Sequence, residues 1–134
     1  MKTRSMLTLD DCKKISAASE AEARKNNWNV CIAILDDGGH LLHLVRMDGA
    51  TPANSRIAIE KGRTAAESRR STAMWEERIK GGRNAMLGMP GITPVQGGLP
   101  IVIDGVCIGG VGVSGVQSHE DEQIAKAGID TLKQ

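Results

Sequence analysis

The chain has 134 residues, enough for one domain with a sizeable core and too few for two comfortable ones, so we expect a single domain over residues 1–134. Its 17 basic and 16 acidic residues give a net charge of +1, which argues against nucleic acid as a partner. The sequence has no apolar run of about 18 residues, the length that crosses a membrane, and the residues after Met1 lack the apolar core of a signal peptide. We therefore expect a cytoplasmic protein with no membrane partner.

The first part of the chain predicts a helix followed by a hairpin. Thr8 and Asp11 form a weak capping box ahead of apolar residues at helical spacing. The β-branched run at 30–35 is typical of a strand that is buried on both faces. A turn at 36–39 and a second strand at 41–47 follow, which together indicate an antiparallel hairpin.

The rest of the chain predicts three helices and a second hairpin. In chain order these elements are helices at 53–68 and 71–79, a long Gly- and Pro-rich loop at 81–98, strands at 99–103 and 106–114, and a helix that Ser118 caps, with Asp121 three residues on. The complete order is therefore α-β-β-α-α-β-β-α. Ala58, Gly62 and Ala65 form a stripe along one helix, and we expect this stripe to pack closely on another backbone.

Residues 110–115 read GVGVSG and match the G-x-G-x-x-G pattern of dinucleotide-binding loops. Such a fold needs a further strand that ends in an acidic residue, and here only a helix follows. That helix opens with Glu120, Asp121 and Glu122, which repel a pyrophosphate. We therefore expect neither NAD nor FAD.

The same glycines fit the interior of a strand, whose side chains alternate between two faces. On this interpretation one face holds Ile108, Gly110, Gly112 and Ser114, and the other holds Cys107, Gly109, Val111 and Val113. The first face is nearly bare toward Ser114. A helix could pack on this face at short range. Alternatively, the face could form the bottom of a shallow cleft in which Gly112 contacts a flat ligand.

Four stretches in order, LDDGGHLLHLVRMDGA, IAIEKGRTA, GGLPIVIDGVCIGGVGVSG and EDEQIAKAG, cover nearly the whole chain. Together they resemble the GlcG/HbpS family, which also contains the C-terminal domain of PduO-type corrinoid adenosyltransferases. The resemblance implies an α+β fold, a profilin/PAS-like α-β-α sandwich with a central antiparallel sheet, and a homo-oligomer. It also implies haem as a cofactor in some members, a label of haem degradation for the group, and catabolic operons for others.

For haem, one axial histidine and an apolar slot would suffice. His40, at the start of a strand, is the candidate ligand of the haem iron. Met86 and Met89 could line the slot or act as a second ligand, or they could fill a core that lacks phenylalanine. His119 lies in the first turn of the last helix, where the dipole favours the neutral imidazole that a metal needs.

A second constellation points to a small anionic ligand. Arg46 and Asp48 leave their strand on one face, and a guanidinium matches a carboxylate with two hydrogen bonds. Lys61 adds positive charge, while Ser114 and Gly115 offer hydroxyl and amide donors. On this hypothesis Arg46, Asp48 and Lys61 are catalytic. The alternative is an internal brace between arginine and a carboxylate that holds the long loop.

Three functions remain open at this point. The first is a protein that binds haem or another small tetrapyrrole, with a protective or sensory role. The second is an enzyme without a cofactor that isomerises, hydrates or opens a small organic acid. The third is an assembly partner without catalysis, which the stripe of small residues suggests.

Overall fold

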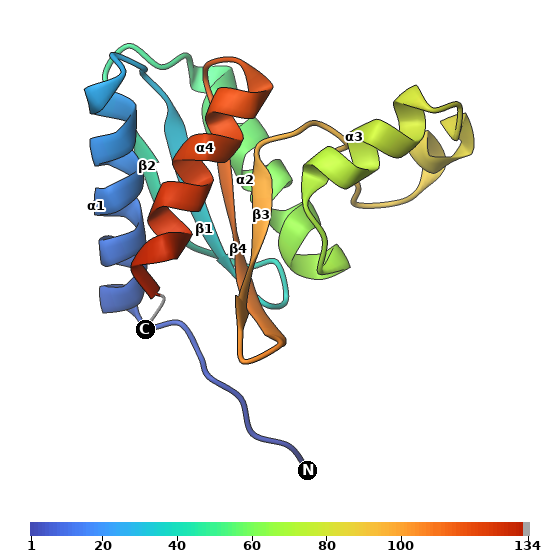
Figure 1. Cartoon of the computed structure of the whole chain (residues 1–134), viewed down its shortest axis with the longest axis horizontal. Helices are drawn as coiled ribbons and strands as arrows, with labels where there is room; N and C mark the ends of the chain where they lie inside the picture. The colour runs from blue at the N-terminus through green and yellow to red at the C-terminus, as the bar shows by residue number, and fades with distance from the viewer. Residues whose placement is uncertain (133–134) are drawn as a thin grey trace.

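A four-stranded sheet lies between α1 and α4 on one face and α2 on the other (Figure 1). The structure is a computed structural model that describes residues 1–132. Its elements are α1 (Leu9–Lys25), β1 (Cys31–Asp36), β2 (Leu41–Arg46), α2 (Pro52–Ser68), α3 (Thr72–Lys80), η1 (Asn84–Gly88), β3 (Gly98–Ile103), β4 (Val106–Ser114), α4 (Ser118–Ile129) and η2 (Asp130–Leu132). The predicted α+β sandwich and its element order are confirmed.

All neighbouring strands of the sheet are antiparallel, in the order β2-β1-β4-β3. The main core lies between the sheet and the pair α1 and α4, where Ile15 and Ile124 meet Ile32 and Ile34 of β1. A smaller cluster lies under α2 and is built mainly from small side chains. Among residues 1–132, no helix is both long and apolar enough to pass through a lipid bilayer.

Helix α2 packs directly on the glycines of β4. A methyl group at Gly112 would collide with the backbone of Ala58 and Gly62, and one at Gly110 would meet Gly62 and Ala66. The stripe of small residues in α2 is thus used inside the chain, which supports the expected close packing on another backbone. Of the two interpretations of the bare face, helix docking is correct, and Gly112 is not open to a ligand.

This contact also leads to a prediction for the dinucleotide pattern. We expect NAD, NADP and FAD to leave the melting temperature unchanged, because α2 occupies the space in front of the glycines. A ligand held at 100 times its dissociation constant would add about 2.7 kcal/mol to the free energy of unfolding. Thermal melts with millimolar dinucleotide measure this directly, and a saturable upward shift would contradict the prediction.

A bulge in β4 corrects part of the predicted alternation. The pairing with β3 shifts after Ile101, so that Ile101 faces Gly109 while Val102 faces Cys107. As a result, Ile108 lies in the main core and the Cys107 thiol contacts the Ala66 carbonyl on the side of α2. The predicted faces of Cys107 and Ile108 are therefore wrong, because an extra residue breaks the period of two.

The helix starts follow local capping chemistry. At α1 the predicted box is confirmed: Thr8 accepts from the Asp11 N–H, and Asp11 accepts from the Thr8 N–H. At α4 the cap lies one residue earlier than predicted. Gln117 is the N-cap and Glu120 closes the box, so Ser118 is already helical and Asp121 is free for another contact.

Residues 72–96, which we call the arm, project from the β3 side of the sheet (Figure 1). The arm comprises α3, the short 3₁₀ helix η1 and the return loop. The region 81–98, predicted as an irregular loop, thus contains one turn of regular structure. Three hydrogen bonds hold the return loop. The Thr93 N–H donates to Thr64 Oγ1 over 2.9 Å, the Thr64 hydroxyl donates to the Gly91 carbonyl over 3.2 Å, and the Gln96 N–H donates to Glu76 Oε1 over 2.9 Å.

Candidate ligand-binding site

The residues predicted to bind a ligand lie in three separate parts of the fold. His40 follows the turn between β1 and β2, at one end of the sheet. The residues at the other end are Arg46, Asp48, Ser114, Gly115 and His119. Met86 and Met89 lie in the arm. No single site therefore contains them all.

The His40 imidazole is 80% exposed and is oriented by Asp36. Its Nδ1 lies 3.1 and 3.2 Å from the two carboxylate oxygens of Asp36, which leaves Nε2 free. Burial raises the pKa of Asp36, but hydrogen bonds from the backbone N–H groups of His40 and Gly38, together with the imidazole, lower it by more. The carboxylate therefore stays charged and fixes the ring, and the ligand role of His40 stays a prediction.

Lys61 lies in a buried ion pair. Its Nζ is 3.1 Å from Asp121 Oδ2 and donates to the Val113 carbonyl over 3.1 Å, and the two side chains are 3% and 2% exposed. Asp121 Oδ1 also accepts from the Val116 N–H. Burial raises the pKa of Asp121, while the Lys61 ammonium opposes this rise. The pair joins α2, β4 and α4, and it turns the Lys61 charge inward.

Two other polar residues at this end of the sheet, Arg46 and Ser114, have partners within the chain. Arg46 Nε donates to the Ala50 carbonyl over 3.3 Å, and the buried Ser114 hydroxyl donates to Asn54 Oδ1 over 2.7 Å. No ion pair joins Arg46 to Asp48 within residues 1–132. These contacts do not assemble Arg46, Asp48 and Lys61 into one open site, and their catalytic role stays a prediction.

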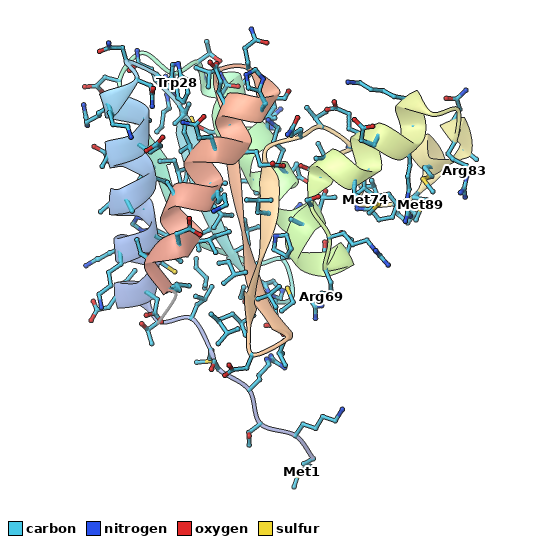
Figure 2. All side chains as sticks on the ribbon, in the orientation of Figure 1. Met1, Trp28, Arg69, Met74, Arg83 and Met89 are labelled. Atoms are coloured by element: carbon cyan, nitrogen blue, oxygen red, sulfur yellow. The ribbon has the colours of Figure 1, made fainter. Side chains whose placement is uncertain are left out.

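The arm, by contrast, carries a cleft of about 350 Å³, near the lower limit for small-molecule sites. Its lining consists of Trp75, Arg78, Arg83, Ala85, Met86 and Met89. Figure 2 shows Arg83 and Met89 on the part of the arm that lies away from the sheet. The cleft thus combines an apolar wall with two guanidinium groups. It contains both methionines that the sequence singled out.

The two arginines of the cleft are available to an anion. Arg78 lies over the Trp75 ring, with its Cζ 5.6 Å from the ring centroid, a cation–π geometry. The Trp75 N–H donates to the Ser68 hydroxyl over 3.1 Å, which fixes the indole against α2. Within residues 1–132 neither Arg78 nor Arg83 forms an ion pair with a carboxylate.

Sequence reasoning missed Trp75, Arg78 and Arg83 as members of this cleft. Arg78 lies near the end of a short helix and Arg83 in a loop, both ordinary places for surface arginines. The one available signal was their density, since a tryptophan, two arginines and two methionines fall within residues 75–89.

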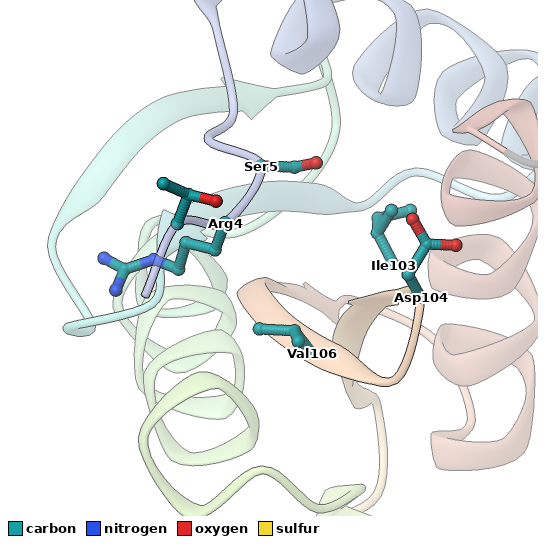
Figure 3. A pocket seen from close by; sticks show the side chains of 6 residues that line it. Arg4, Ser5, Ile103, Asp104 and Val106 are labelled. Carbon is teal, nitrogen blue, oxygen red and sulfur yellow. The ribbon is translucent and has the colours of Figure 1, made fainter. Parts of the chain in front are cut away.

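A larger cleft, of about 470 Å³, lies between the N-terminal segment and the hairpin of β3 and β4 (Figure 3). Arg4 and Asp104 are its charged residues. The Arg4 guanidinium already pairs with Asp37 at 2.7 Å. This cleft therefore has no unpaired arginine for an anionic ligand, whereas the arm cleft has two.

The structure defines an α+β protein with a cleft in the arm, outside its core. The chain belongs to the family described as haem degrading protein HbpS-like, whose model matches residues 7–130. It is 50% identical to protein GlcG of Escherichia coli K12 over 114 residues, 85% of each chain. The resemblance drawn from the four sequence stretches is confirmed.

Two solved structures show the same fold. A double mutant of Streptomyces reticuli HbpS superposes with a TM-score of 0.90 at 30% identity, over 100% of this chain and 92% of that one. A complex of PduOC with haem gives a TM-score of 0.88 at 25% identity, over 96% of both chains. The family and this complex support a ligand-binding protein.

Proposed function

We propose that this protein binds haem, or another flat tetrapyrrole that carries carboxylates, in the arm cleft. The observation that carries the proposal is the pair Arg78 and Arg83, without carboxylate partners, beside a wall of methionine and tryptophan. An apolar plane with acidic substituents at its edge matches this combination of surfaces. The family description and the haem complex of PduOC support this ligand class.

The residues of the cleft fit haem by their chemistry. Thioether sulfur is an established iron ligand, and Met86 and Met89 both line the cleft. Guanidinium groups bind carboxylates such as the propionates with paired, charge-assisted hydrogen bonds. Haem, when bound, supplies a redox-active iron. The chain's own contribution is to hold the macrocycle and to shield one face of it.

His40 is the second candidate for the iron ligand. Its free Nε2 and its fixed ring suit coordination. The imidazole is, however, highly exposed, and so it lacks an apolar wall against which the macrocycle could pack. Haemin titrations of variants at His40 and at the two methionines separate these positions.

We expect haemin to bind with a saturable shift of its Soret band. Replacing both arginines, in Arg78→Gln/Arg83→Gln, should weaken binding at least tenfold, since each charge-assisted hydrogen bond contributes roughly 1.5–3 kcal/mol. Met86→Leu and Met89→Leu preserve the side-chain volume. The variant that lacks the sulfur coordinating the iron should show a shifted Soret band. Titration by absorbance measures both effects.

Arg56→Gln is the matched control, because Arg56 is exposed on α2 outside the cleft and its loss changes the net charge in the same direction. Binding that is unchanged in the double arginine variant would refute the arm cleft. A band that disappears only in His40→Ala would assign the iron to His40. No saturable binding by the wild type would refute haem as the ligand.

A further inference from the structure

A small polar cleft lies where α1 ends and β1 begins, outside the arm. It has a volume of about 240 Å³ and is lined by Arg24, Asn27, Trp28, Asn29 and Met47. Figure 2 shows Trp28 near the end of α1, away from the labelled residues of the arm. This cleft, which we call the tryptophan cleft, is therefore separate from the proposed haem site.

The backbone of the tryptophan cleft is fixed by the way in which α1 ends. The Trp28 N–H donates to the Ala23 carbonyl over 2.9 Å, and the Asn27 N–H donates to the Arg24 carbonyl over 3.1 Å. This pair of bonds requires a left-handed residue after the helix, and Asn27 adopts that conformation with a φ of 60°. Trp28 also packs against the main core. The side chains at 27–29 are therefore presented from an ordered turn.

The hydrogen-bonding groups of the tryptophan cleft are unused. Within residues 1–132 neither the side-chain amides of Asn27 and Asn29 nor the indole N–H of Trp28 has a hydrogen-bond partner. The turn after β2 confines one of these amides, because a methyl group at Gly49 would lie 2.7 Å from Asn29 Nδ2. Each amide offers both an acceptor and a donor, and the indole adds a donor.

The tryptophan cleft has no free cation among its lining residues. The Arg24 guanidinium pairs with Glu20, whose Oε2 lies 2.8 Å from both Nε and Nη2. The negative end of the α1 dipole also lies here, and it disfavours an anion. The cleft thus favours a neutral ligand, whereas the arm cleft with its two unpaired arginines favours an anionic one.

We propose that the tryptophan cleft binds a neutral ring with several hydroxyl groups, in the class of the monosaccharides. An indole offers an apolar surface to the C–H groups of such a ring, and its N–H and the two amides can bond to the hydroxyls. Small-molecule sites combine an apolar surface and a few placed polar groups in this way. The volume lies below the range of about 300–1,000 Å³ for drug-sized ligands, which suits a single ring.

Titration with D-glucose, D-galactose and D-mannose, followed by NMR of the indole N–H resonances, tests the site. The chain has two tryptophans, so the variant Trp75→Phe assigns both resonances. At least one of the sugars should shift the Trp28 resonance saturably at millimolar concentration and leave that of Trp75 in place. The uronic acid of the same sugar should bind more weakly, because it adds a carboxylate to the same ring.

Two asparagine variants locate the sugar in the cleft. Asn27→Gly removes an amide and keeps the backbone, because glycine adopts a positive φ freely. Asn27→Gly and Asn29→Ala should each weaken binding about fivefold, the effect of losing one neutral hydrogen bond. Asn84→Ala is the control, because Asn84 is exposed on the arm and lines neither cleft.

The outcomes that overturn the proposal do not depend on haem. They are the absence of a saturable shift with all three sugars, a shift of the Trp75 resonance in place of that of Trp28, and unchanged affinity in both asparagine variants. A shift caused by adenosine and by none of the sugars would assign the cleft to a nucleobase and would overturn the proposal as well.

Discussion

Replacing Lys61 by methionine is expected to lower the free energy of unfolding by about 3–5 kcal/mol at pH 7, the usual cost of breaking a buried ion pair from one side. Methionine replaces the apolar stem of the lysine but leaves the Asp121 carboxylate, which is 2% exposed, without its cation. Urea denaturation followed by circular dichroism measures the loss. Lys126→Met is the matched control, because the pair of Lys126 with Asp130 is exposed and such pairs contribute about 0–1 kcal/mol.

The pH dependence of this variant has a definite sign. Burial already raises the pKa of Asp121 in the folded protein, and loss of the Lys61 ammonium removes the largest influence that opposes that rise. The folded state then binds a proton more readily than the unfolded chain, so acidification stabilises it. The deficit of Lys61→Met relative to the wild type should shrink from pH 7 to pH 5. A deficit that grows on acidification would show that Asp121 is not the group left unpaired.

The second large effect is expected from Gly112→Ala, which should cost about 3 kcal/mol or more. The new methyl group would collide with the backbone of Ala58 and Gly62, and a helix backbone cannot move aside as a flexible side chain can. The helix α2 must therefore shift as a unit. Chemical denaturation gives the size of the effect.

Gly88→Ala is the matched control for this prediction. Gly88 lies at the end of η1, and nothing lies within 4 Å of the position of the added methyl group. We expect a change near zero there. Equal losses at positions 88 and 112 would mean that the contact of α2 with β4 is not the source of the cost.

The elements of the fold were predictable because the signals that define them are local. The cap at Thr8, the apolar run of β1 and the two hairpin turns each depend on a few adjacent residues. The bulge at Ile108 was not predictable in this way, because an extra residue in a strand leaves the composition unchanged. Its position depends on how β3 and β4 pair.

The surroundings of Lys61 and Asp121 were harder to predict from the sequence, because these two residues are distant in the chain. Asp121 read as one of three acidic residues at a helix start, yet its partner Lys61 lies 60 residues away. Lys61 was interpreted as a surface cation that binds a ligand, because its distant partner Asp121 could not be seen in the sequence. In the arm, only the fold shows that Arg83 and Met89 face the same cleft as Trp75.

The arm has a consequence for how the molecule opens. Its helices contribute few buried side chains, Thr72, Trp75 and Met86, whereas the sheet and its covering helices hold the large apolar clusters. Regions with little buried apolar surface open by sub-global unfolding at a fraction of the global free energy. We therefore expect the protein to unfold as two cooperative units, with the arm opening before the sheet and the helices that cover it. A ligand that binds in the arm must also stabilise its folded form, and this lowers the observed affinity.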